Sequence, residues 1–308
     1  MARQRNAFIQ NLVAHISIAF CRGMGVLPLP VCRAVGRGIG IFMYACVPRV
    51  RSVALDNVRK AYGDSLSESE ARDIARGAAI NVGIVAAEFA HLPRLTPENI
   101  ARWITVEGAE NFNRELPGFI IGAHLGNWEW MATVIKNLGF NVAEVVRPLD
   151  APALNAYVDR IRQSRGVRTI DKTGGGQEML RLLKEGWIAG VLADQSPRES
   201  AVPVTFFGRP CWATIGPAMV ALRQKMPMVV VTMTRKPDGN YVLRISPPIS
   251  LERSGDFRAD LVTITQRCQD ILEQEIRAHP EQWLWLHRRW KSRPRLEQEW
   301  SKKKSAEA

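Results

Sequence analysis

The stretch Gly118-Phe-Ile-Ile-Gly-Ala-His124-Leu-Gly-Asn-Trp-Glu129-Trp130 joins a short apolar strand to the start of a helical pattern. Its apolar residues 119–121 are flanked by glycines, and the Gly-Asn pair after the histidine is typical of a turn that leads into a helix. We therefore expect His124 at the carboxyl end of a strand and Glu129 in the first turn of the next helix. Strand ends that face a helix start are where α/β sheets place their functional sites.

The spacing of His124 and Glu129 suits acid–base chemistry. On one continuous helix, residues five positions apart would point about 140° away from each other, at ~3.6 residues per turn. With the histidine in the loop and the acid in the first helical turn, the carboxylate can hold one ring nitrogen. The other nitrogen is then a better base for a substrate proton, an effect of roughly 10²–10⁴ in rate. The alternative is that His124 caps the helix and Glu129 interacts with the helix dipole.

Composition places the chain among globular proteins that have anionic partners. Of its 308 residues, 46% are apolar and 23% are charged, so the chain can bury a large core. The net charge of +12 predicts attraction to phospholipid headgroups, phosphorylated substrates, acidic carrier proteins or nucleic acid, and does not choose among them. The five cysteines contain no Cys-x-x-Cys pair and the five histidines show no metal-ligand spacing. This usage predicts a reducing, cytoplasmic setting and no zinc site.

Residues 1–50 carry apolar segments that are interrupted by arginines, glycines and prolines. No stretch reaches ~18 uninterrupted apolar residues, so a clean membrane span is not predicted. The apolar segments also run beyond any short cleavable signal. Basic residues interleaved with apolar faces favour an N-terminal membrane-associating region of helices that lie in the interface. The alternative is a pair of core helices packed on the main domain.

The rest of the chain alternates between strand and helix patterns, which predicts an α/β fold with a central, mostly parallel mixed sheet flanked by helices. A capping box, Ser67-Glu-Ser-Glu70, begins a long helix before the sheet, and Glu88 and His91 are expected at its surface or end. We expect the α/β domain over residues 51–295 and a basic polar tail over 296–308. The expected strands are 104–106, 119–123, 142–146, 167–170, 187–193, 202–206, 228–234 and 241–245. Helices are expected over 127–138, 152–165, 176–185, 213–224 and 256–278.

Two further groups of polar side chains follow expected strands. Arg147 comes directly after the strand 142–146, beside a proline-fixed turn, where a guanidinium can bind a phosphate or a carboxylate. Arg160 and Arg162 lie on the next helix, where the alternative is an ordinary solvated face. Arginines at this edge of the sheet predict a site for an anionic group.

Asp194 and Gln195 end the apolar strand 187–193. If that strand runs parallel to the one before His124, the two ends open on the same edge of the sheet. Asp194 and His124 would then belong to one site. The alternative is that Asp194 only begins the turn before Pro197.

Five blocks, in order along the chain, resemble the bacterial lipid A lauroyl/myristoyl acyltransferases of the glycerolipid acyltransferase superfamily. They are Gly122-Ala-His-Leu-Gly-Asn-Trp-Glu129, Arg147-Pro-Leu with the Arg-x-Arg helix after it, Asp194-Gln195, residues 206–223 and residues 282–291. The resemblance covers about residues 50–292. The fragmented apolar region before it departs from the family's pattern.

The resemblance implies direct acyl transfer without a metal or a cofactor. His124, oriented by Glu129, would remove the proton of an acceptor hydroxyl, which attacks an acyl thioester. Backbone N–H groups of Gly126 and Asn127 are the expected donors to the oxyanion. The aromatic loop in residues 206–214, expected between a strand and a helix start, suits an acyl-chain groove.

The resemblance also implies the partners and the place of action. The donor would be acyl carrier protein, or acyl-CoA, and the acceptor a phosphorylated glycolipid at the cytoplasmic face of the bacterial inner membrane, with no nucleic acid involved. The expected substrate-binding residues are Arg147, Arg160, Arg162, Asp194 and Gln195, together with the Gly-Asn turn. Arg160 occupies the position of the family's functionally important arginine.

Two other functions remain open from the sequence. One is an acyltransferase for another membrane lipid, such as a lysophospholipid or a glycosylated phosphoinositide, with acyl-CoA as donor. The other is a basic, membrane-binding protein without catalysis. Alanine variants of His124 and Glu129 separate the second possibility from the first.

Overall fold

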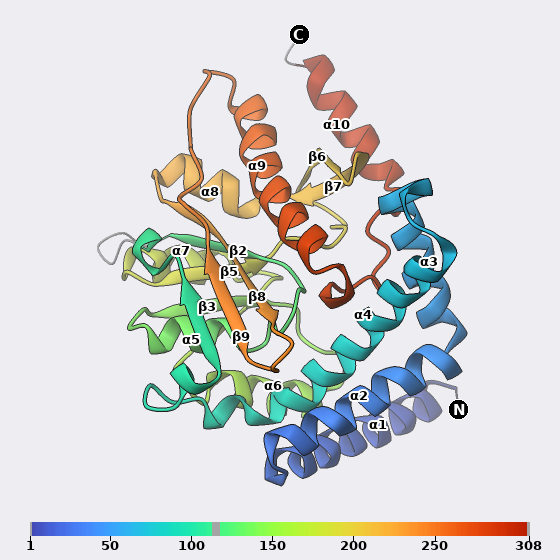
Figure 1. The fold of residues 1–308 in the computed structure, drawn as a ribbon. Coiled ribbons are helices and arrows are strands. Elements are labelled where there is room, and N and C mark those ends of the chain that lie inside the picture. The colour runs from blue at the N-terminus through green and yellow to red at the C-terminus, as the bar shows by residue number, and fades with distance from the viewer. Residues whose placement is uncertain (1, 113–117, 307–308) are drawn as a thin grey trace.

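The computed structural model describes residues 2–112 and 118–306. Within them lies a seven-stranded sheet with the order β1-β9-β8-β2-β5-β3-β4 (Figure 1). Neighbouring strands run parallel except β8 and β9, which are antiparallel, so the predicted mostly parallel mixed sheet is confirmed. The strands are β1 Ile104–Glu107, β2 Phe119–Gly122, β3 Val142–Val146, β4 Arg168–Asp171, β5 Ile188–Leu192, β8 Met228–Arg235 and β9 Tyr241–Ile245.

Both faces of the sheet are covered, which explains why its strands read as nearly continuous apolar runs. On β2, Phe119 and Ile121 belong to one hydrophobic core and Ile120 to the other, because successive side chains point to opposite faces. The helices of the α/β part are α5 Met131–Asn137, α6 Pro152–Gln163, α7 Gly176–Lys184, α8 Gly216–Gln224 and α9 Phe257–Ala278. Short 3₁₀ turns lie at Gly63–Ser65, Phe89–Arg94, Ile100–Arg102, Ala109–Asn111 and Pro280–Gln282.

A two-stranded hairpin, β6 Ala201–Phe206 and β7 Arg209–Thr214, stands where a strand and an aromatic loop were expected. Its turn residues Phe207 and Gly208 both have positive φ, 51° and 68°, as a two-residue hairpin turn of this hand requires. Phe206 and Phe207 are 0% and 4% exposed and lie in the core. The expected acyl-chain groove at this loop is therefore wrong.

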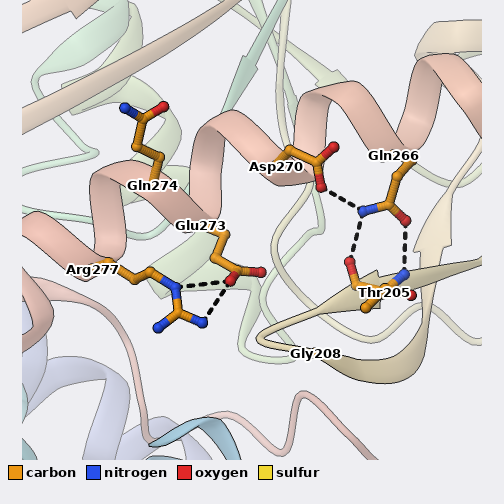
Figure 2. A pocket seen from close by; sticks show the side chains of 7 residues that line it. All are labelled: Thr205, Gly208, Gln266, Asp270, Glu273, Gln274 and Arg277. Atoms are coloured by element: carbon orange, nitrogen blue, oxygen red, sulfur yellow. Dashed lines mark hydrogen bonds and ion pairs between the residues drawn. The ribbon is translucent and has the colours of Figure 1, made fainter.

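Side chains of α9 hold this hairpin in place (Figure 2). Gln266 bonds both the N–H and the C=O of Thr205, at 2.7 and 2.8 Å, and Glu273 accepts the N–H of Phe207. Arg277 in turn bonds Glu273 at 2.8 Å. A hollow of about 400 Å³ lies between the hairpin and α9, and these polar groups on its wall are engaged with one another. We therefore assign the contacts around this hollow a structural role.

The N-terminal helices pack closely on the rest of the chain. They are α1 Ala2–Val26, α2 Leu29–Cys46, α3 Pro48–Tyr62 and α4 Glu68–Glu88, and the predicted capping box at Ser67 is present. Helix α2 crosses α4 through glycines: a Cβ on Gly36 would lie 2.6 Å from the carbonyl of Gly83, and one on Gly40 would lie 2.4 Å from a backbone atom of Ile80. Only glycine permits such close backbone contact. The inner face of α2 is thus part of the main domain.

The exposed residues of α1 and α2 include large apolar side chains as well as polar ones. Both helices lie at the lower edge of the molecule in Figure 1. Within the described residues, no single helix has the length and composition of a membrane span, although α2 and the segment Pro48–Ser65 pass that test together as a pair bent by 88°. Exposed large apolar side chains on α1 and α2 include Leu12, Val13, Ile16, Val26, Val31 and Phe42.

Most of the expected basic polar tail lies in a helix. Helix α10 spans Pro294–Ala306. Leu296 is 4% exposed, and the guanidinium of Arg258 lies 3.6 Å above the ring of Trp300. The start of the expected basic tail is therefore packed on the domain.

Candidate active site

Strand register brings His124 and Asp194 together. Strands β2 and β5 are parallel neighbours, with Gly122 opposite Leu192. His124 and Asp194 each follow two residues later, so they leave the sheet at the same edge and at the same level. The expectation that these two strand ends open on one edge is confirmed.

Asp194, and not Glu129, holds the imidazole. The Nδ1 atom of His124 lies 2.8 Å from Oδ1 of Asp194, and the backbone N–H of His124 donates to Oδ2 at 2.9 Å. The side chain of Asp194 is 2% exposed and that of His124 20%, so the acid is buried behind a partly accessible ring. The prediction that Glu129 orients His124 is corrected here.

The electrostatics of the pair favour a fixed imidazole orientation. Burial opposes ionisation of Asp194, but the charge and hydrogen bonds of His124 outweigh it and lower the pKa of Asp194 to about 2. Burial also opposes protonation of His124, but the charge and hydrogen bond of Asp194 raise its pKa above the ordinary value. Because an ionised carboxylate accepts only, it holds the proton on Nδ1 and leaves Nε2 as the free base. The Nε2 atom of Gln195 lies 3.4 Å from that nitrogen.

Glu129 lies in the turn before α5 rather than in the first turn of the helix. Arg162 of α6 donates two hydrogen bonds to its carboxylate, from Nε at 3.0 Å and from Nη2 at 2.8 Å. The indole of Trp128 donates a third, at 3.2 Å. Glu129 therefore orients Arg162 and acts on His124 only through its charge.

The predicted oxyanion donors are occupied. The N–H of Gly126 donates to the carbonyl of Gln282 at 3.1 Å, and the N–H of Asn127 donates to that of Met233 at 3.2 Å. Gly126 has φ 58°, and a Cβ there would lie 1.7 Å from the Met233 oxygen. The Gly-Asn turn thus fixes the loop that carries His124, and its N–H groups are not available to a substrate.

The three predicted arginines are not brought together. Arg147, in the loop after β3, is 66% exposed and lies 3.8 Å from Asp150. Arg160 is exposed on α6 above the ring of Tyr157, at 5.4 Å. Arg162 alone reaches the group of residues near His124, where Glu129 neutralises it. The geometry thus favours Arg162 over Arg160 as the arginine that shapes this site.

A cavity of about 80 Å³ lies beside the histidine, between the sheet and α5. Trp128 is one of its lining residues, and its ring centroid is 5.3 Å from that of His124. The wall is mostly apolar and includes the flexible side chain of Met131. The lining residues are Ile120, Gly122, Trp128, Glu129, Met131, Ala132, Ile135, Val142, Glu144, Val145, Val146, Arg162, Gly190, Val191 and Leu192.

Glu144 on β3 is an acid on this apolar wall that the sequence did not single out. Its side chain is 19% exposed, and its carboxylate lies 3.9 Å from Nε of Arg162. Burial raises the pKa of Glu144 to about 8. The positive charge of Arg162 lowers this pKa, but the negative charges of Glu129 and Asp159 raise it again. At neutral pH the cavity wall therefore carries mainly a neutral carboxylic acid.

The raised pKa of Glu144 predicts a pH-dependent stability. Between the ordinary pKa of 4.5 and about 8, the folded protein holds a proton that the unfolded chain has lost. The free energy of unfolding should therefore fall as pH rises through this window, by up to about 1.4 kcal/mol per pH unit. Urea unfolding of wild type and Glu144→Gln at several pH values measures this contribution. Equal slopes for the two proteins would contradict it.

The described residues thus form a mostly parallel sheet whose carboxyl edge presents a His–Asp pair near an apolar cavity. The model of the family described as bacterial lipid A biosynthesis acyltransferase matches residues 3–292. The chain belongs to this family, which confirms the resemblance read from the sequence, and it is an O-acyltransferase.

Relatives cover nearly the whole chain. The lipid A biosynthesis palmitoleoyltransferase of Escherichia coli K12 is 28% identical over 88% of this chain and 90% of its own length. The lauroyltransferase of the same organism is 28% identical over 88% and 91%. The phosphatidylinositol mannoside acyltransferase of Mycobacterium tuberculosis H37Rv is 24% identical over 66% of each chain.

Proposed function

We propose that this protein transfers a fatty acyl chain from an acyl thioester to a hydroxyl of a lipid A precursor, with His124 as the general base and Asp194 as its orienting acid. The observation that carries the proposal is the His124–Asp194 pair, which lies near an apolar cavity because the ring of Trp128 contacts both the imidazole and the cavity. Neither a metal nor an enzyme nucleophile is needed for this reaction.

The reaction needs one proton carrier. The acceptor hydroxyl gives its proton to Nε2 of His124 while its oxygen attacks the thioester carbonyl carbon. The C–S bond of the tetrahedral intermediate then breaks, and the imidazolium returns the proton to the leaving thiolate. The ionised carboxylate of Asp194 stabilises the imidazolium between these steps. The amide of Gln195, beside Nε2, is the polar group in place to donate to the oxyanion.

The cavity is the proposed site of the acyl chain, with Gly190 on its wall. A Cβ on Gly190 would meet only one atom within 4 Å, the carbonyl of Ala143 at 3.8 Å, so a Cβ is accepted there without moving the backbone. Gly190→Val should lower kcat/KM for a long-chain donor by about 10- to 100-fold, since each excluded methylene forfeits ~0.8 kcal/mol. A short-chain donor, assayed with the same variant, is the internal control. An equal loss for both donors would place the chain elsewhere.

The named relatives support a glycolipid acceptor. Two of them are named as lipid A biosynthesis acyltransferases, and the match covers about nine-tenths of the length of each. Acyl carrier protein is the proposed donor, because its acidic surface complements the +12 charge of this chain. The exposed Arg147 and Arg160, on the side of β3 and α6, are proposed to contact phosphate groups of donor or acceptor.

Membrane association completes the proposal. The apolar side chains of α1 and α2 that face outward would lie in the lipid interface at the cytoplasmic face of the inner membrane. This arrangement brings a lipid acceptor to the protein without its leaving the bilayer. The 1–50 region would then serve both as a lipid contact and, through α2, as a wall of the domain.

Mass spectrometry of lipids tests the proposed function. A deletion strain should produce lipid A that lacks one secondary acyl chain, and the purified protein should restore it from acyl carrier protein thioesters. Acyl-CoA, in parallel reactions, tests the donor. An intact lipid A together with a changed phosphoinositide mannoside or lysophospholipid would favour the second candidate, which the mycobacterial relative supports. Unchanged lipids and no transfer from either donor would contradict both.

A further inference from the structure

The C-terminal segment 282–285 lies against the loop that carries His124. Trp283 forms a β-bridge with Leu125, and the N–H of Leu284 donates to the carbonyl of His124 at 3.0 Å. The carbonyl of Gln282 accepts the N–H of Gly126. A segment about 160 residues further along the chain thus fixes the backbone on both sides of the histidine.

Trp283 also reaches the acid of the pair. Its indole N–H donates to Oδ2 of Asp194 at 2.8 Å, while Oδ1 of the same carboxylate faces Nδ1 of His124 at 2.8 Å. The side chains of Trp283 and Asp194 are buried, each 2% exposed, so water does not substitute for this donor. The three groups form a linear chain of hydrogen bonds from indole to carboxylate to imidazole.

The indole is held firmly in this orientation. Its ring packs against Phe206, Phe207 and Trp285, with centroid distances of 5.7, 6.3 and 4.5 Å. Aromatic contacts of this kind restrict the ring to one geometry. The direction in which Trp283 presents its N–H is therefore set by the fold and not by Asp194.

We propose that Trp283 is a positioning residue for acyl transfer, which holds Oδ2 of Asp194 so that Oδ1 faces the imidazole of His124. Without the indole N–H, the backbone N–H of His124 is the one donor to Oδ2 that remains among the described residues. The carboxylate can then rotate about its Cβ–Cγ bond and disturb the orientation of the ring. The inference rests on the proposed role of His124 as general base.

Loss of the indole donor also changes how strongly the carboxylate of Asp194 attracts a proton on the imidazole of His124. A hydrogen bond to a carboxylate stabilises its ionised form and reduces its attraction for a neighbouring cation. Removing the indole N–H should therefore raise the pKa of His124 further. The other charged or titratable groups that act on the ring are Glu129 before α5, Arg162 on α6 and His287 in the C-terminal segment. The substitution leaves all three in place.

A pair of tryptophan variants separates positioning from packing. Trp285 lies in the same aromatic cluster and is fully buried, but its indole donates to the carbonyl of Pro280 at 2.7 Å. Trp283→Phe and Trp285→Phe therefore remove the same atoms and one hydrogen bond each, the first buried and the second partly buried. Only the first removes a bond to Asp194. The purified full-length variants are assayed for acyl transfer as a function of pH, with thermal unfolding as the measure of packing.

The expected result is specific to Trp283→Phe. Its kcat should fall about tenfold at neutral pH, and the acidic limb of its kcat/KM profile should move up by about one pH unit. Trp285→Phe should lose comparable thermal stability, and the acidic limb of its kcat/KM profile should lie at the same pH as that of the wild type. The inference would be overturned if the acidic limbs of all three proteins lay at the same pH, or if both variants shifted the limb equally.

A separate variant, His124→Ala, tests the proposed function independently of the role of Trp283. If His124→Ala keeps full activity, the general-base role fails and the inference loses its basis. If His124→Ala is inactive while Trp283→Phe behaves like Trp285→Phe, the proposed function stands and only the role of Trp283 is refuted.

Discussion

Replacement of His124 by alanine is expected to lower kcat/KM for acyl transfer by about 10²–10⁴-fold. The ring is the proposed proton acceptor, and in the variant the carboxylate of Asp194 keeps the hydrogen bonds from the backbone N–H of residue 124 and from the indole of Trp283. An unchanged kcat/KM in a folded variant, measured with the acyl thioester and the acceptor below their KM, would falsify the assignment. The retained thermal unfolding midpoint is the control for folding.

Acyl-transfer kinetics as a function of pH distinguish the roles of Asp194 and Glu129. Asp194→Asn removes the charge that raises the pKa of His124 and offers the ring no carboxylate acceptor, so the imidazole can adopt the wrong tautomer. Its kcat should fall by about 10²–10⁴-fold, and the acidic limb of the profile should move to lower pH. Glu129→Gln should shift that limb less, because Glu129 acts on the ring without a hydrogen bond. A larger shift for Glu129→Gln would restore the sequence-based pairing.

Replacement of Glu88 by alanine is expected to destabilise the protein by about 3–5 kcal/mol, because it leaves buried positive charge uncompensated. Glu88 is 0% exposed at the end of α4. Its carboxylate pairs with Arg33 of α2, lies 3.6 Å from Arg235 of β8, and accepts the hydroxyl of Tyr241 and the amide of Asn127 at 2.8 Å. One acid thus holds α2, the sheet and the turn after His124 together.

A matched control lies on the same helix. Glu68, also on α4, pairs with Arg59 at 2.7 Å, but both side chains are more than half exposed, so Glu68→Ala should leave the unfolding midpoint nearly unchanged. Urea unfolding monitored by tryptophan fluorescence compares the two variants. Equal midpoints would show that the Glu88 network contributes no more than a surface pair.

The sequence predicted the architecture well because the relevant signals are local. Apolar runs ended by glycines and polar residues marked the strands of the parallel sheet, and the parallel alignment of 119–122 with 188–192 followed from the alternation with helices. The capping box at Ser67 is likewise a short-range pattern. The helix after His124 began later than expected, because Asn127 and Gly126 bond to distant carbonyls instead of continuing into a helix.

The site depended on long-range contacts that spacing does not encode. A separation of five residues favoured Glu129 as the partner of His124, whereas strand register supplied Asp194 from seventy residues away. Glu144 looked like an ordinary strand residue because its role arises from its neighbours across the cavity. Glu88, expected at the surface, is buried because α2 brings an arginine to it. The sequence singled out Trp283 only as a member of the block of tryptophans and arginines in residues 282–291, and predicted no contact with Asp194.

The close glycine crossing of α2 and α4 makes the N-terminal region inseparable from the enzyme. Deleting the first 47 residues to obtain a trimmed, easily handled fragment would remove Arg33 and open the backbone groove at Gly83 to water. The uncovered carboxylate of Glu88 would then be solvated at the expense of its bond to Asn127. Shortening this chain at its apolar end would therefore unsettle the loop that carries His124.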